Sequence, residues 1–216
     1  LRPCPLNQEA FWMGVRELDR TLGMLFDYLE QNYAPDKYIV NLYSDHGNSV
    51  FTTPTGGVID IIGENSTRAA WMMRGAGIPK GLVADELTSI ADIYPTLAHL
   101  AGFPVAEDID GNLPAVFGGT PRDAVYSLSI FPRQTFKLAV RTHTHALRLE
   151  TRGYTEDDGT VDFAEAQVGI YPRGHEREEG YAMDSPELRA FFYPRARDFV
   201  REIASNGERF PLPEQV

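Results

Sequence analysis

Apolar residues recur at intervals of four and three positions near the start of the chain. The positions concerned are Phe11, Val15, Leu18, Leu22, Leu25 and Leu29. Such spacing predicts an amphipathic helix over about residues 8–31, with one apolar face. Gly14 and Gly23 lie inside this helix. Because each glycine costs about 1 kcal/mol relative to alanine in a helix, we expect a neighbour to pack closely against it.

A short run of apolar and β-favouring residues follows at positions 38–43. We predict a buried strand there, which ends at Asp45-His46-Gly47. A second strand is predicted at residues 69–74. Since a helix precedes the first strand, we expect an α/β fold with part of a mixed or parallel sheet and flanking helices.

Turn-forming residues separate these elements from a short second helix. The stretch over residues 47–64 is rich in glycine, threonine, serine and proline, which predicts a long loop. A helix is predicted at residues 93–101, closed by Gly102. We expect Asp92 to be its N-cap, because that choice places Pro95 in the first turn, where amide groups have no helical partner.

The pattern changes after about residue 120. Residues 125–130, 136–142 and 146–150 read as antiparallel strands, and a polar loop follows with residues 156–159 at its tip. A last helix is predicted from Ser185 to Ile203, with Pro186 at its first position and a kink or break at Pro194. We therefore expect a small α+β subdomain over residues 121–216, after a domain part over residues 1–120.

Composition narrows the class of protein. Hydrophobic residues make up 43% and charged residues 24%, as in ordinary globular proteins. The formal net charge is −11 and no basic patch is visible, so no nucleic-acid partner is expected. No apolar run approaches the roughly 20 residues of a membrane helix, and Leu1 to Gln8 does not resemble a signal peptide. We expect no membrane partner; the compartment stays open, with the cytoplasm slightly favoured. Cys4 is the one cysteine, so it forms no internal disulfide.

Asp45 and His46 are the strongest candidates for chemistry. They follow a predicted strand, at the end where ligand sites of open α/β sheets lie. Gly47 frees the backbone, so the carboxylate and the imidazole can converge on one divalent metal ion. The alternative is that Asp45 caps backbone amides beside an incidental histidine.

The remaining histidines carry weaker signals. His99 lies on the second predicted helix and is interpreted as a surface or packing residue. His143 and His145 alternate at a strand edge and so are expected to share a face; a metal pair is a minor alternative there. We expect His175 to be solvated, in a charged loop with Glu176.

An ordered series of short segments surrounds Asp45-His46-Gly47. It continues with ENSTR at 64–68, GAGIPKG at 75–81, IADIYPTL at 90–97 and LAGFP at 100–104. This order resembles the sulfatase family of the alkaline-phosphatase superfamily, and only the C-terminal half of its members. Upstream, Asp19 and Leu22-Gly23 match the helix before the motif. The resemblance covers about residues 8 to 150.

The resemblance implies a metal-dependent hydrolase of sulfate esters, with a small anionic ester as substrate. Asp45 and His46 match two of the family's four metal ligands; the other two come from the N-terminal half. We expect one divalent ion, Ca²⁺ first, with Mn²⁺ or Mg²⁺ as alternatives. The family's nucleophile is a formylglycine, made from a Cys/Ser-x-Pro-x-Arg motif that is also N-terminal.

Two departures from the family pattern are visible. No Cys/Ser-x-Pro-x-Arg motif occurs in this sequence, so we assign no catalytic nucleophile to it. Members also carry a lysine in the loop after Asp-His-Gly, whereas residues 48–66 contain no Lys, Arg or His. We expect this chain alone to be inactive and to need a missing N-terminal half, a partner chain or a homo-oligomer. The alternatives are a non-catalytic or degenerate sulfatase-like module and, nearer, a phosphonate or phosphodiester hydrolase.

Overall fold

The chain has a mixed α/β fold that divides into two compact units. The computed structural model describes residues 5–48, 60–176, 178 and 180–210. The first unit comprises Leu1–Asp60, Asn65–Asp85 and Ile90–Phe117, and the second comprises Ile61–Glu64, Glu86–Ser89 and Gly118–Val216. Cys4 and residues 49–59 of the predicted loop lie outside the described residues.

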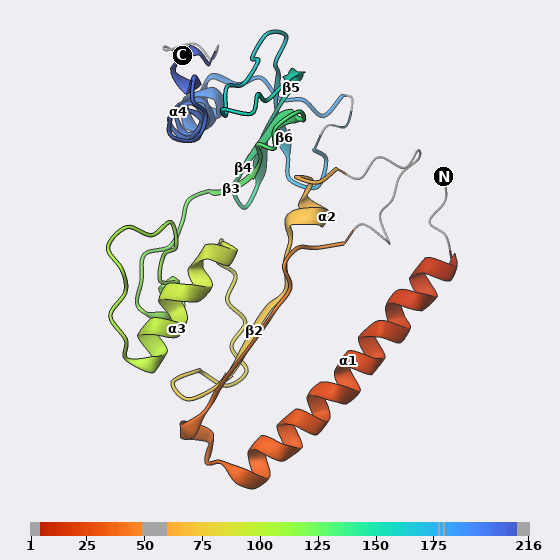
Figure 1. The fold of residues 1–216 in the computed structure, drawn as a ribbon, viewed down its shortest axis with the longest axis vertical. Coiled ribbons are helices and arrows are strands. Elements are labelled where there is room, and N and C mark those ends of the chain that lie inside the picture. The colour runs from red at the N-terminus through yellow and green to blue at the C-terminus, as the bar shows by residue number, and fades with distance from the viewer. Residues whose placement is uncertain (1–4, 49–59, 177, 179, 211–216) are drawn as a thin grey trace. The chain divides into compact units, whose positions relative to one another are not determined.

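The first unit begins with the predicted amphipathic helix, α1, at Pro5–Asn32 (Figure 1). None of the residues of its apolar stripe is buried; Leu18, for example, is 51% exposed. Around Gly14 and Gly23, nothing outside the helix backbone lies within 4 Å of an added Cβ. The close neighbour that we expected at these glycines is therefore absent from the described part of the chain.

A two-stranded antiparallel sheet follows in the same unit. It consists of β1 at Ile39–Tyr43 and β2 at Trp71–Gly75, with Ile39 opposite Gly75. The Trp71 indole N–H donates to Oδ1 of Asn41 over 2.7 Å across the pair. The prediction of a buried strand at β1 is wrong, because its residues are half-buried and Tyr43 is exposed. In the described residues β1 pairs with β2 alone, which leaves its other edge uncovered.

The second predicted helix is α3, at Ile93–Ala101. Gly102 ends it in the left-handed conformation, at φ +75°, as predicted. Asp92 occupies the N-cap position, but its side chain makes no capping bond. Instead, its Oδ1 accepts from the N–H of Asn112 over 2.7 Å, because Asp92 is itself the last residue of a 3-10 turn. Its role is structural, as expected, through a different bond.

The second unit contains a four-stranded antiparallel sheet in the order β3-β4-β5-β6 (Figure 1). The strands are Val125–Ser129, Thr135–Arg141, His145–Tyr154 and Gln167–Pro172. The first three confirm the predicted strands, with shifted ends. The sequence pattern did not predict β6, which pairs with β5 so that Leu147 lies opposite Ile170.

Helix α4, at Pro186–Ile203, packs its apolar side into one core with this sheet. Ser185 caps it by accepting from the N–H of Leu188 over 3.2 Å. Pro194 lies inside the helix and does not break it. The fully buried residues of the core come from alternate strand positions and one helix side, and they include Phe136, Leu138, Val140, Leu147, Phe192, Ala196 and Val200. No helix in the described ranges is long and apolar enough to cross a membrane.

Candidate functional site

Asp45 and His46 lie just beyond the C-terminal end of β1, and their side chains turn toward each other. Nε2 of His46 is 3.5 Å from Oδ2 of Asp45. The N–H of His46 also donates to Oδ1 of Asp45 over 3.0 Å, which fixes the carboxylate beside the ring. Both side chains are exposed. The expected convergence of the two side chains is confirmed; their role as metal ligands stays a prediction.

The hydrogen bonding of His46 leaves one ring nitrogen suited to a metal. Nδ1 of His46 lies 2.6 Å from the carbonyl oxygen of Gly47. Because a carbonyl oxygen can only accept, Nδ1 is the donor, and in the neutral ring Nε2 keeps its lone pair. Ligand atoms lie about 2.0–2.6 Å from the cation that they bind, so two ligand atoms of one cation lie less than about 5 Å from each other. The 3.5 Å separation of Nε2 from Oδ2 of Asp45 fits such a pair.

Gly47 allows the backbone behind this pair to pack closely. Its N–H donates to the carbonyl oxygen of Ser66 over 2.8 Å. A Cβ added to Gly47 would lie 2.7 Å from the carbonyl oxygen of Arg68 and closer still to that of Asn65. Only glycine fits at this position without a shift of the ENSTR segment. Close packing therefore explains why the third residue of Asp45-His46-Gly47 is a glycine.

A second set of bonds ties Ser44, the residue after β1, to Ala70, the residue before β2. The N–H of Ser44 donates to the carbonyl oxygen of Ala70 over 3.0 Å. Its hydroxyl oxygen accepts from the N–H of Ala70 over 2.8 Å. Ser44, the residue before Asp45, is therefore held by both its backbone and its side chain. The backbone that leads from β1 to Asp45 consequently has a fixed direction.

The other histidines do not join this pair. Among the residues that the structure describes, no group of three or more His, Cys, Asp or Glu side chains could hold a metal ion. His99 is exposed on α3, as expected. The expectation that His143 and His145 share a strand face is wrong, because His143 lies in the turn between β4 and β5. His175 is partly exposed and stacks on Tyr181, with 4.2 Å between ring centroids.

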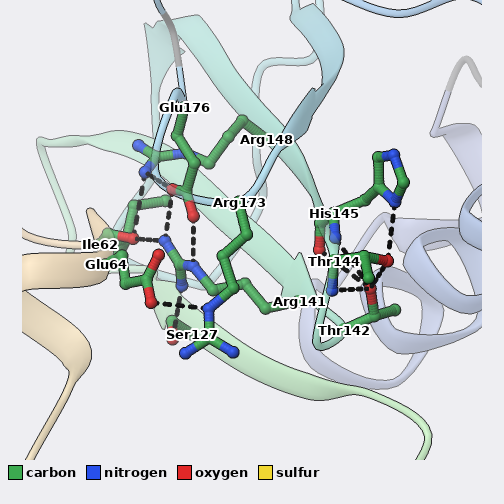
Figure 2. A network of polar contacts seen from close by, with 10 residues as sticks. All are labelled: Ile62, Glu64, Ser127, Arg141, Thr142, Thr144, His145, Arg148, Arg173 and Glu176. Carbon is green, nitrogen blue, oxygen red and sulfur yellow. Dashed lines mark hydrogen bonds and ion pairs between the residues drawn. The ribbon is translucent and has the colours of Figure 1, made fainter.

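Sequence analysis missed a buried charge cluster in the second unit (Figure 2). Glu176 accepts from Nε of Arg141 over 2.6 Å and from Nη1 of Arg148 over 2.9 Å. Both guanidinium groups also donate to the carbonyl oxygen of Ile62. The side chains of the three charged residues are only 4–6% exposed. The Glu176 side chain is therefore buried, although it lies in the same charged loop as His175.

A neighbouring ion pair extends the contacts to the start of α2, at Glu64–Thr67. Nε of Arg173 donates to Oε1 of Glu64 over 2.6 Å (Figure 2). The pair is partly buried, with side chains 28% and 18% exposed. Ile62 and Glu64 contact residues 79 to 109 positions away, and such contacts leave no local signal in the sequence, so only the structure reveals them.

The comparisons with known proteins all lead to one family. A family model described as Sulfatase matches residues 7–103. Arylsulfatase K of Homo sapiens is 30% identical over 132 residues, which cover 61% of this chain and 22% of that protein. Choline-sulfatase of Rhizobium meliloti is 32% identical over 101 residues, 47% of this chain and 19% of that protein. The chain thus spans about a fifth of the length of each of these relatives.

A solved structure supports the fold. The structure of a 2-O GAG sulfatase superposes with a TM-score of 0.54 at 17% identity. The superposition covers 79% of this chain and 37% of that one. The covered share of this chain exceeds the range of the family match, so the likeness in fold continues beyond residue 103.

Proposed function

We propose that this chain, whose residues 7–103 match the sulfatase family model, supplies Asp45 and His46 to the divalent-metal site of a sulfuric ester hydrolase. The observation that carries the proposal is the convergence of Nε2 of His46 and Oδ2 of Asp45, 3.5 Å apart, inside the segment that matches the family. The relatives named above are sulfatases, which supports a sulfate ester as the substrate class.

The residues of this chain would act by holding and orienting. Asp45 contributes negative charge and an oxygen donor, and His46 contributes a nitrogen donor whose ring is fixed by its bond to Gly47. When bound, a divalent ion would act as a Lewis acid toward the sulfate oxygens. A carboxylate suits Ca²⁺ first, whereas the imidazole also suits Mn²⁺, and Mg²⁺ is the third candidate. Because a protein site for such ions has at least four ligands, we propose that other ligands come from outside the described residues.

Metal binding can be tested on the chain itself. Mn²⁺ broadens NMR signals of nearby nuclei, so it detects a weak, partial site. We expect the amide signals of Asp45 and His46 to broaden first, and the effect to disappear in Asp45→Asn and His46→Gln. Asp36→Asn and His99→Gln are matched controls, because both residues are exposed and lie in the same matched segment. Equal broadening in Asp45→Asn and wild type would refute the proposed ligand pair.

Turnover is the second part of the proposal. We propose that the chain alone does not hydrolyse aryl sulfates, because it contains no Cys/Ser-x-Pro-x-Arg motif and residues 48–66 contain no cationic side chain. Loss of a nucleophile costs several orders of magnitude in rate. The same two features favour a second candidate, a non-catalytic sulfatase-like module. Hydrolysis of an aryl sulfate that Asp45→Ala abolishes would contradict the proposed inactivity and exclude the module.

A further inference from the structure

The segment Ile61–Glu64 belongs to the second unit although its sequence neighbours belong to the first. Ile62 is 2% exposed, and its carbonyl oxygen accepts from both Arg141 and Arg148. Glu176 bonds both guanidinium groups, so neither can rotate away without losing a charged partner. Planar guanidinium groups hold such geometry better than lysine does. This cluster therefore fixes the backbone at Ile62.

The pairing of the strands explains why both arginines lie on one face of the sheet. Ala139 of β4 is opposite Arg148 of β5, and Leu138 is opposite Leu149. Because successive strand residues alternate between faces, the leucine pair belongs to the core with α4 and the arginines belong to the other face. The second face of the sheet thus carries charge where the segment Ile61–Glu64 covers it.

A second attachment point follows two residues later. Glu64 is held by Arg173, whose own N–H donates to the carbonyl oxygen of Thr144 over 2.8 Å. Arg173 directly follows β6, so its backbone is fixed by the sheet. Ile62 and Glu64 are therefore both anchored to the same sheet within the second unit.

Glu64 is also the first residue of α2. The residues that follow it contact Gly47, which directly follows the proposed ligand pair in the first unit. Ser66 accepts from the N–H of Gly47, and the carbonyl oxygens of Asn65 and Arg68 are the groups that a side chain at Gly47 would meet. Consecutive Cα atoms lie 3.8 Å apart, so a shift of Glu64 passes directly to the residues that follow it.

We propose that Arg173, together with Arg141 and Arg148, positions the Asp45–His46 pair through the covalently continuous segment from Ile62 to Ser66. These arginines are positioning residues, since they contact neither of the two proposed ligands in any interaction described above. The inference rests on the proposed function only for its consequence in metal binding. Its structural part concerns the backbone at Gly47 and stands separately.

Hydrogen exchange and Mn²⁺ titration of the same variants test the two parts. The variants are Arg173→Met and Glu64→Gln, with Arg173→Lys as the conservative replacement. Lys137→Met is the matched control, because the Lys137–Glu150 pair has the same 2.6 Å length and side chains 16% and 27% exposed on the same sheet. A general loss of stability would affect the control as well, whereas a positioning role would not.

We expect Arg173→Met and Glu64→Gln to accelerate exchange of the Gly47 amide by about tenfold or more, with Lys137→Met near wild type. Arg173→Lys should restore part of the protection, and the Mn²⁺ affinity at Asp45 should fall and recover in parallel. Equal exchange at Gly47 in Arg173→Met and Lys137→Met would overturn the inference. If wild type binds no Mn²⁺, the proposed ligand pair fails, and exchange at Gly47 alone still decides the positioning role.

Discussion

The N–H of Gly47 donates to the carbonyl oxygen of Ser66 over 2.8 Å, which joins the residue after the proposed ligand pair to the middle of the ENSTR segment. Nineteen sequence positions separate the two residues, so the bond joins two distant parts of the first unit. It also explains how Asp45 and His46 can be exposed and still have a fixed backbone direction.

Replacement of Gly47 by alanine tests this close approach. The added Cβ would meet two backbone carbonyl oxygens, which cannot rotate away as a side chain could. We expect Gly47→Ala to lower the free energy of unfolding by about 1–3 kcal/mol and to weaken Mn²⁺ binding. Gly14→Ala is the control, because no atom of the described residues outside the α1 backbone lies within 4 Å of the added Cβ; it should stabilise the chain by about 0.5–1 kcal/mol. Urea titrations of both variants would measure the difference, and an equal sign for the two changes would contradict the packing argument.

The buried carboxylate of Glu176 gives a prediction about stability. Its removal leaves Arg141 and Arg148 buried without their shared anion, so Glu176→Ala should cost about 3–5 kcal/mol. Glu165→Ala is the control, because its ion pair with Arg152 of β5 is largely exposed. Exposed pairs contribute about 0–1 kcal/mol. Denaturant midpoints that fall equally in the two variants would show that the cluster adds nothing beyond a surface pair.

The elements that sequence analysis predicted well have strong local signals. The spacing of apolar residues defined α1 within a few positions, and Gly102 ended α3 as expected. The end of the last helix matched, and Ser185 caps its start. Strand β6 was missed because Gly169 and Pro172 weaken its pattern. The structure shows that the Tyr171 side chain lies over Gly169, so the glycine serves packing that sequence cannot reveal.

The candidate site was predictable only in part, because local sequence patterns do not reveal contacts between distant residues. Asp45, His46 and Gly47 are adjacent, so a motif and a strand end sufficed to bring them together. Asp92 was predicted to cap α3 because that choice places Pro95 in the first turn, whereas its bond to Asn112 spans twenty positions and has no local pattern. The contact of Glu176 with Arg141 likewise spans 35 positions. Non-local charge pairing, rather than weak propensity, limited the prediction.

Tyr126 gives a prediction about alkaline pH. Burial raises the pKa of its hydroxyl above the ordinary value of 10.0, and its ring stacks on Phe199. In the window between the unfolded and the folded pKa, the unfolded chain loses the proton while the folded chain keeps it. Stability should therefore fall as pH rises through about 10 and above. Tyr126→Phe should reduce this loss in urea titrations at several pH values, and an unchanged pH dependence would count against Tyr126 as its source.

The exposed apolar side of α1 gives the last prediction. Val15, Leu18 and Leu25 of its apolar stripe are 37%, 51% and 41% exposed, and soluble monomers rarely expose large apolar patches. The chain also spans about a fifth of the length of its named relatives. We therefore expect the chain alone to self-associate with increasing concentration in light-scattering chromatography and to bind an apolar dye. Leu18→Glu should shift it toward monomer, whereas Gln31→Glu, with the same change in charge on the same helix, should not. A dye-negative monomer at all concentrations would show that α1 needs no cover.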